Sequence, residues 1–196
     1  RKIAVKRLKD LKIKFEIFYG IDGKKIKKKL LKKIYDPLKT KKNIGRYLSP
    51  AEIGTSASHI AIYKKIVREN INNAIILEDD IYISDKFLEW IRTKRSVKRN
   101  EILSFFATPS GFVKKKSEFS IILNNQSIHI HESASHLFSC AAYQIHKSTC
   151  KKILKKNKKV CSIPDWPFKF KEDKIKLYLA LPFLCTAFDK NFSHLN

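Results

Sequence analysis

Three consecutive carboxylates are the residues of this chain whose types and spacing most clearly indicate chemistry. Glu78, Asp79 and Asp80 directly follow the apolar run at residues 74–77, which is typical of a buried strand. Ligands bind at the carboxyl edge of open α/β sheets, and neighbouring negative charges need a cation or solvent to stay ionised. If the extended geometry continues, Glu78 and Asp80 point the same way. Carboxylates are usual ligands of Mg²⁺ and Mn²⁺, so we predict a divalent metal site; an acidic loop that caps the next helix is the alternative.

The cysteines and the last histidine give weaker indications of chemistry. The cysteines form no CxxC pair, have no histidine at metal-ligand spacing and lie among apolar neighbours; they are Cys140, Cys150, Cys161 and Cys185. We therefore interpret them as buried free thiols in a reducing compartment, rather than as disulfides or zinc ligands. His194 is a candidate late metal ligand, with a disordered terminal histidine as the alternative.

A helix is predicted directly before the acidic strand. Ser49 can cap it, Pro50 suits its first position, and Glu52 completes a capping box, so the helix should begin here and run to about Glu69. Residues 24–47 are lysine-rich and are left unassigned. The pattern predicts further helices at residues 1–12, 87–98 and 147–156, and strands at 13–19, 102–106, 119–123, 128–130, 140–145 and 175–181.

These elements indicate the fold class. Helices and strands alternate in the first half of the chain, and the second half is richer in strands. The uninterrupted apolar run at residues 74–77 suits a central strand that is covered on both faces. We expect one α/β domain over residues 1–196, with a mixed, mostly parallel sheet and helices on both faces.

The charge balance indicates an affinity for anions. The chain has 42 Lys and Arg residues against 18 Asp and Glu residues, a net charge of +24. Nucleic acid, an acidic membrane surface and phosphorylated sugars would all attract it. The lysines cluster at residues 24–33, 39–42, 114–116 and 147–159, although lysine filling exposed positions explains many of them equally well.

The chain shows no targeting or membrane-spanning pattern. Its first residues have no apolar core of a signal peptide. The longest uncharged apolar run, residues 177–188, contains Pro182 and is shorter than the roughly 20 residues that span a bilayer. We expect a cytoplasmic protein, or one that is peripheral on the inner face of a membrane.

Several segments together resemble glycosyltransferase family 25, which includes galactosyltransferases of bacterial lipooligosaccharide synthesis. The stretch Glu-Ile-Gly-Thr-Ser-Ala-Ser-His at residues 52–59, followed by Ile-Ile-Leu-Glu-Asp-Asp at 75–80, is similar to the family patterns "gEiGCalSH" and "alILEDD". Residues 15–23 resemble its "fe.f.AiDG" segment, residues 141–145 its "aaYlIs" strand, and residues 163–166 its "piDw" element.

The resemblance implies a glycosyltransferase-A-like fold, a UDP-sugar donor, most often UDP-galactose, and Mn²⁺ or Mg²⁺ at the acidic motif. By this resemblance Asp80 binds the metal directly, Glu78 and Asp79 contribute to metal or donor binding, and His59 supports the site. His59 and Glu52 have core or capping roles as alternatives. The acceptor hydroxyl needs a base, for which Asp165 beside Trp166 is the candidate, with a simple turn as the alternative.

The chain departs from the family pattern in two places. Thr55 stands where the family usually has cysteine, and the chain begins within or after the family's usual first strand, which helps to bind the nucleotide base. Two alternatives therefore stay open: a non-catalytic relative, and a nucleic-acid-binding protein or nuclease. Nucleic acid is the less favoured partner because the chain has no known nucleic-acid-binding signature.

Overall fold

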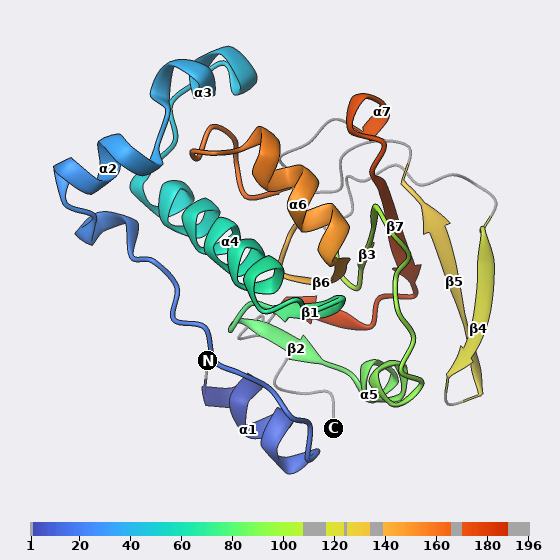
Figure 1. The fold of residues 1–196 in the computed structure, drawn as a ribbon. Helices are drawn as coiled ribbons and strands as arrows, with labels where there is room; N and C mark the ends of the chain where they lie inside the picture. Colours follow the sequence, from blue (N-terminus) through green and yellow to red (C-terminus); the bar gives the residue numbers. More distant parts are fainter. Residues whose placement is uncertain (1, 108–116, 124, 134–138, 166–169, 188–196) are drawn as a thin grey trace.

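A computed structural model describes residues 2–107, 117–123, 125–133, 139–165 and 170–187. Its centre is a six-stranded sheet flanked by helices (Figure 1). In spatial order the strands are β1 (Asn73–Leu77), β6 (Ala142–His146), β3 (Glu101–Ser104), β7 (Lys176–Leu181), β5 (Gln126–Glu132) and β4 (Phe119–Leu123). A separate pair joins β2 (Ile81–Ile83) to β8 (Cys185–Ala187). The α/β class with a mixed sheet is therefore confirmed.

The sheet is mixed but not mostly parallel, so that part of the prediction was wrong. Among the described strands β3 and β7 run parallel, whereas β1–β6, β3–β6, β4–β5 and β5–β7 are antiparallel. Parallel pairing needs a long crossover connection, whereas a tight turn makes neighbours antiparallel. The short turn between β4 and β5 illustrates why the strand-rich second half adds antiparallel pairs.

Helices cover both faces of the sheet, as predicted. On one face α4 (Pro50–Arg68) and α6 (Lys147–Lys156) lie against each other (Figure 1). Their side chains pack on β1, β6, β3 and β7 in a cluster that includes Tyr63, Ile76, Tyr143 and Ile153. The opposite face carries α5 (Asp85–Arg92), which is shorter than the predicted helix at residues 87–98.

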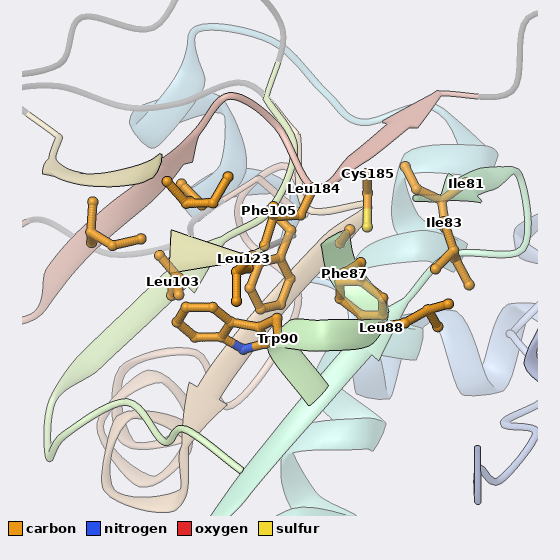
Figure 2. Packing of buried hydrophobic residues seen from close by; sticks show 14 of the residues in the cluster. Ile81, Ile83, Phe87, Leu88, Trp90, Leu103, Phe105, Leu123, Leu184 and Cys185 are labelled. Carbon is orange, nitrogen blue, oxygen red and sulfur yellow. The ribbon is translucent and has the colours of Figure 1, made fainter. Parts of the chain in front are cut away.

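The second core cluster lies under α5. Figure 2 shows Phe87 and Trp90 of α5 with Phe105, which follows β3. The Phe105 ring meets the Phe87 ring edge-on at a centroid distance of 5.2 Å and the Trp90 ring at 5.6 Å, an arrangement that aromatic pairs favour. Ile81 and Ile83 of β2 and Cys185 of β8 join this cluster. The small sheet that follows the acidic motif is thereby anchored to the main core.

The helix before the acidic strand begins as predicted. The Ser49 hydroxyl accepts from the Glu52 backbone at 3.3 Å, and the Glu52 carboxylate accepts from the Ser49 backbone at 2.8 Å. Arg46 also donates to both oxygens of Glu52. Glu52 is thus a capping residue, which was one of the two roles left open for it.

The lysine-rich region before α4 contains two short helices that the sequence pattern does not indicate. They are α2 (Lys28–Ile34) and α3 (Pro37–Ile44), and they follow the single turn η1 (Gly23–Lys25). Tyr35, between the two helices, packs with Leu48, Ile53 and Val160 in a third apolar cluster. The predicted N-terminal helix is present as α1 (Lys2–Asp10), and α7 (Phe170–Asp173) is an additional short helix.

Residues 13–19 were predicted to be a strand, and this prediction was wrong. They form no strand but run past α4, where Glu16 pairs with Lys65 at 2.9 Å and the Ile21 backbone donates to the Ser58 hydroxyl at 2.8 Å. Directly after this segment the backbone approaches α4 closely, because Gly54 of α4 and Gly23 have no side chains: a Cβ on Gly54 would lie 2.5 Å from the Ile21 carbonyl.

The acidic strand is also not central. Within the described chain β1 pairs only with β6 and forms one edge of the main sheet. Residues 74–77 are all apolar because both faces of the strand are covered. Ile75 and Leu77 pack towards the α5 cluster, whereas Ile76 packs towards α4. Both faces of an edge strand can thus be covered, which the sequence pattern does not distinguish from a central position.

Candidate active site

The acidic motif lies where β1 ends and the chain turns towards β2. The Glu78 backbone N–H donates to the Ala141 carbonyl at 2.7 Å, so pairing with the chain before β6 continues one residue beyond β1. Asp79 and Asp80 then form the turn and are exposed. The extended geometry therefore stops at Glu78, so the condition under which Glu78 and Asp80 would point the same way is not met.

Glu78 points to the same face of β1 as Ile76, towards α4, because side chains alternate along a strand. Its Oε1 atom lies 3.3 Å from Nε2 of His59 on α4. The Cys140 sulfur lies 3.4 Å from the same Nε2 atom and 3.7 Å from the same Oε1 atom. His59 and Cys140 are buried, whereas Glu78 is one-third exposed. Three metal-ligand atoms thus form a compact triangle below the turn.

Two buried tyrosines hold the histidine of this triangle. The Tyr143 hydroxyl lies 2.8 Å from Nδ1 of His59, and the Tyr63 hydroxyl lies 2.9 Å from that of Tyr143. The Tyr143 and His59 rings also stack. Because a hydroxyl both donates and accepts, the two tyrosine hydroxyls can form hydrogen bonds with either tautomer of His59. The ring is therefore fixed on both of its nitrogens.

Asp165 is the predicted base, and the structure places it beside Cys140. Burial raises the pKa of Asp165, and repulsion from Glu78 adds to the rise, whereas hydrogen bonds from Cys140 oppose it. Asp165 is half-buried. Trp166, the predicted aromatic partner, lies outside the described residues, as does His194.

A large cleft runs along the outer edge of β1. Its volume is ≈ 990 Å³, and all three acidic residues line it together with His59 and Ser58 of α4. Residues 13–21 form its other wall, with several exposed apolar side chains. Asp165 is absent from the described residues that line this cleft. The acidic motif thus borders a space large enough for a small-molecule ligand.

The carboxylates of the motif experience opposite environments. Hydrogen bonding from His59 holds the pKa of Glu78 below its ordinary value, despite partial burial. Partial burial raises the pKa of Asp80, and the negative charges of Glu78 and Asp79 raise it further. The charged form of Glu78 is therefore stabilised by a hydrogen bond from within the protein, whereas Asp80 carries repulsion that a bound cation would relieve.

Sequence analysis missed Cys140 and the two tyrosines. Spacing along the chain alone gives this cysteine no histidine partner. All four cysteines are buried free thiols, as predicted, but Cys140 contacts His59 across 81 residues. The available signal was the strand pattern at residues 74–77 and 140–145, since antiparallel pairing of these strands brings Glu78 opposite the chain next to Cys140.

A comparison with known protein families shows the class to which the chain belongs. The family model of glycosyltransferase family 25, described as a lipopolysaccharide biosynthesis protein, matches residues 1–168. The chain therefore belongs to glycosyltransferase family 25, a family of lipopolysaccharide biosynthesis, as the resemblance implied. No curated protein matches the chain.

Proposed function

We propose that this glycosyltransferase uses a UDP-sugar, with galactose as the sugar the family resemblance implies, and extends a lipooligosaccharide or related glycan. The observation that carries the proposal is the position of Glu78, Asp79 and Asp80 on the cleft of ≈ 990 Å³. A nucleotide sugar is a ligand of the size that such a cleft accommodates. The family supports the transfer of a sugar to lipopolysaccharide.

The donor set of the motif fits a hard divalent ion. Asp79 and Asp80 offer exposed carboxylate oxygens on the cleft, and Mg²⁺ and Mn²⁺ prefer such ligands together with phosphate oxygens. We assign direct binding to Asp80, assisted by Asp79. Glu78, the second ligand predicted from sequence, bonds through Oε1 to His59, so its role in this proposal is to fix the turn that presents the two aspartates.

Transfer requires displacement of a nucleoside diphosphate at an anomeric carbon through an oxocarbenium-like transition state. A bound Mg²⁺ or Mn²⁺ supplies charge stabilisation of the departing diphosphate. Asp165 is the proposed base for the acceptor hydroxyl. Its raised pKa suits this role because a base works best when its pKa lies near the operating pH.

The far end of the cleft is basic and supports an anionic acceptor. Lys94 and Arg95 line the cleft beside the first residues of β1, at the end opposite to Asp80. Phosphorylated or acidic saccharides of a lipooligosaccharide core would be attracted to this end. This end would hold charged groups distant from the reacting hydroxyl, which must itself meet the donor sugar near the acidic motif.

The lysines on and around α2 and α3 are proposed to contact an anionic membrane surface. Every lysine from residue 24 to residue 42 is exposed, and exposed Leu30 and Leu38 lie among them. Each basic residue near an anionic bilayer contributes about 1 kcal/mol of attraction. No helix in the described ranges combines the length and apolarity needed to cross a membrane.

Calorimetric titration with UDP in the presence and absence of Mn²⁺ tests the proposed donor site. The wild-type chain should bind UDP with Mn²⁺, and Asp80→Asn should weaken that binding at least about tenfold, the equivalent of 1.4 kcal/mol. Asp85→Asn is a matched control because Asp85 is exposed at the start of α5 and pairs with Arg7. Absence of Mn²⁺-dependent binding by the wild type would contradict the proposal, as would equal binding by Asp80→Asn.

Turnover is tested separately by following UDP release from UDP-galactose with Mn²⁺, as the galactosyl group passes to an added lipooligosaccharide acceptor or, without acceptor, to water. Release should require the wild-type motif and fall in Asp80→Asn, whereas Asp85→Asn should match the wild type. UDP binding without turnover would favour the non-catalytic relative. A steep salt-dependent affinity for DNA that is unaffected by Asp80→Asn would instead favour the nucleic-acid-binding alternative.

A further inference from the structure

The proposed donor site uses neither His59 nor Cys140 as a ligand, and it uses Glu78 only to fix the turn that presents the two aspartates. The triangle of these three residues lies on the inner side of the acidic turn, where α4, the end of β1 and the chain before β6 converge. Its three atoms are an imidazole nitrogen, a carboxylate oxygen and a thiol sulfur. These are the ligand types that zinc takes in proteins.

The distances within the triangle match one face of a zinc tetrahedron. Zinc bonds of about 2.3 Å to sulfur and about 2.0–2.2 Å to nitrogen and oxygen place tetrahedral ligand atoms roughly 3.3–3.6 Å apart. The observed separations are 3.3 Å for nitrogen to oxygen, 3.4 Å for sulfur to nitrogen and 3.7 Å for sulfur to oxygen. An ion would therefore fit without a large movement of the side chains.

The surroundings of the triangle also resemble those of a metal site. A metal-binding histidine usually has its second ring nitrogen fixed by a hydrogen bond, and Tyr143 provides that bond to Nδ1 of His59. Cys140 as a thiolate and Glu78 as a carboxylate would balance the charge of a divalent ion in a largely buried place. His59 and Glu78 also line the large cleft, which gives an ion a route to the triangle.

We propose that His59, Glu78 and Cys140 bind a thiophilic divalent cation of the zinc class, distinct from the ion proposed at Asp80. Three protein ligands leave one position for water. Thiolate and imidazole favour zinc over Mg²⁺ and Mn²⁺, which the oxygen donors of Asp79 and Asp80 suit. The ion would join α4 to the base of the acidic motif and hold Glu78 in place. Binding releases the thiol proton, so affinity falls with decreasing pH.

Cobalt(II) substitution tests the proposal on the full chain without any measurement of transfer. The chain is stripped with a chelator and titrated with Co²⁺, which shows a near-ultraviolet charge-transfer band when a thiolate binds it. The wild type should show this band at equimolar Co²⁺, and Zn²⁺ should abolish it by competition. If the wild type shows no band, the proposal is overturned and the triangle is a hydrogen-bonded cluster. This outcome does not depend on any variant.

Two variants locate the thiolate. Cys140→Ser should lose the band and lower zinc affinity at least about 100-fold, beyond the 10–100-fold effect typical of outer partners. Cys185→Ser is the matched control, because Cys185 is an equally buried free thiol in the α5 cluster; it should keep the band. A band that persists in folded Cys140→Ser overturns the assignment.

Two further variants separate this site from the donor site and test its outer support. Asp80→Asn should keep the cobalt band while it loses Mn²⁺-dependent UDP binding, so either proposal can fail alone. Tyr143→Phe removes the hydroxyl beside His59 and should lower zinc affinity about 10–100-fold while it retains the band. Loss of the band in Asp80→Asn would show that the two ions share one site and would overturn the proposal.

Discussion

The hydroxyl of Tyr143 lies 2.8 Å from Nδ1 of His59, and the two rings stack with their centroids 5.8 Å apart at an angle of 23°. Tyr143 belongs to β6 and His59 to α4. This contact therefore joins the sheet to the helix that lies beside the acidic motif. It also sets the direction in which Nε2 of His59 faces Glu78.

Tyr143→Phe should lower the free energy of unfolding by about 1–3 kcal/mol, because it leaves buried polar groups of His59 and Tyr63 without this partner. Urea unfolding in the presence of a chelator measures the change without any contribution from metal. Tyr47→Phe is the control, since Tyr47 is largely exposed and should lose little. Equal stability of Tyr143→Phe and the wild type would show that the hydroxyl is not required.

The contact between α4 and the segment before η1 depends on glycine. Gly54→Ala should lower the free energy of unfolding by about 1–3 kcal/mol, because the new Cβ would lie 2.5 Å from the Ile21 carbonyl. Gly20→Ala is the matched control, since its Cβ would meet only the Ser58 hydroxyl at 3.5 Å. Thermal unfolding measures both. Residues 13–21 line the cleft, so Gly54→Ala should also weaken UDP binding; equal stability of the two variants would refute the predicted clash.

Glu78 and Asp80 should respond to pH with opposite signs. Folding lowers the pKa of Glu78 through the His59 hydrogen bond, so its stabilising effect is present above the ordinary value of 4.5 and is lost as the pH falls through the folded pKa. Folding raises the pKa of Asp80 through burial and repulsion. The ionised Asp80 carboxylate therefore destabilises the folded state at neutral pH, and this destabilisation disappears as the pH falls through the pKa of Asp80 in the folded state.

In chelator at pH 7, Glu78→Gln should therefore destabilise the chain, by on the order of 1 kcal/mol because Glu78 is one-third exposed. Asp80→Asn should slightly stabilise it. Urea unfolding from pH 7 to pH 3 measures both, and the loss of stability in acid should be shallower for Glu78→Gln than for the wild type. Destabilisation by Asp80→Asn at pH 7 would show that its carboxylate is satisfied within the protein.

Asp165→Asn tests the proposed base. The transfer rate should fall about 10²–10⁴-fold, the usual contribution of a general base, whereas Mn²⁺-dependent UDP binding should stay within error of the wild type. Glycosyl transfer to a lipooligosaccharide acceptor measures the rate, and calorimetry measures the binding. An unchanged rate would show that Asp165 is not the base, and its contact with Cys140 would then be its remaining role.

Local signals explain which elements the sequence predicts well. The capping residues Ser49 and Glu52 define the start of α4, and the apolar run defines β1. Both signals can be read from the sequence because each involves only residues that are neighbours along the chain. The same reasoning failed for residues 13–19. Their alternation indicates a strand, but a strand needs a partner strand. Here the segment runs past α4 instead: Glu16 pairs with Lys65, and the backbone at Ile21, directly after the segment, lies close to Gly54.

The candidate site was predicted in part for the same reason. Glu78, Asp79 and Asp80 are adjacent in sequence, and His59 lies on the preceding helix, so their proximity follows from one helix–strand unit. Cys140 enters only through antiparallel pairing between β1 and β6. Nothing in the spacing along the chain indicates that partner, nor does it show that β1 lies at an edge.

The bond between the Glu78 backbone and the Ala141 carbonyl means that strand alignment selects which acid meets His59. Side chains alternate with a period of two, so a one-residue slip of β1 against β6 would turn Glu78 away from α4. A neighbouring residue would then face His59 in place of Glu78. A deletion in the short connection between α4 and β1 would thus act on the chemistry of the cleft, although no residue of the motif itself had changed.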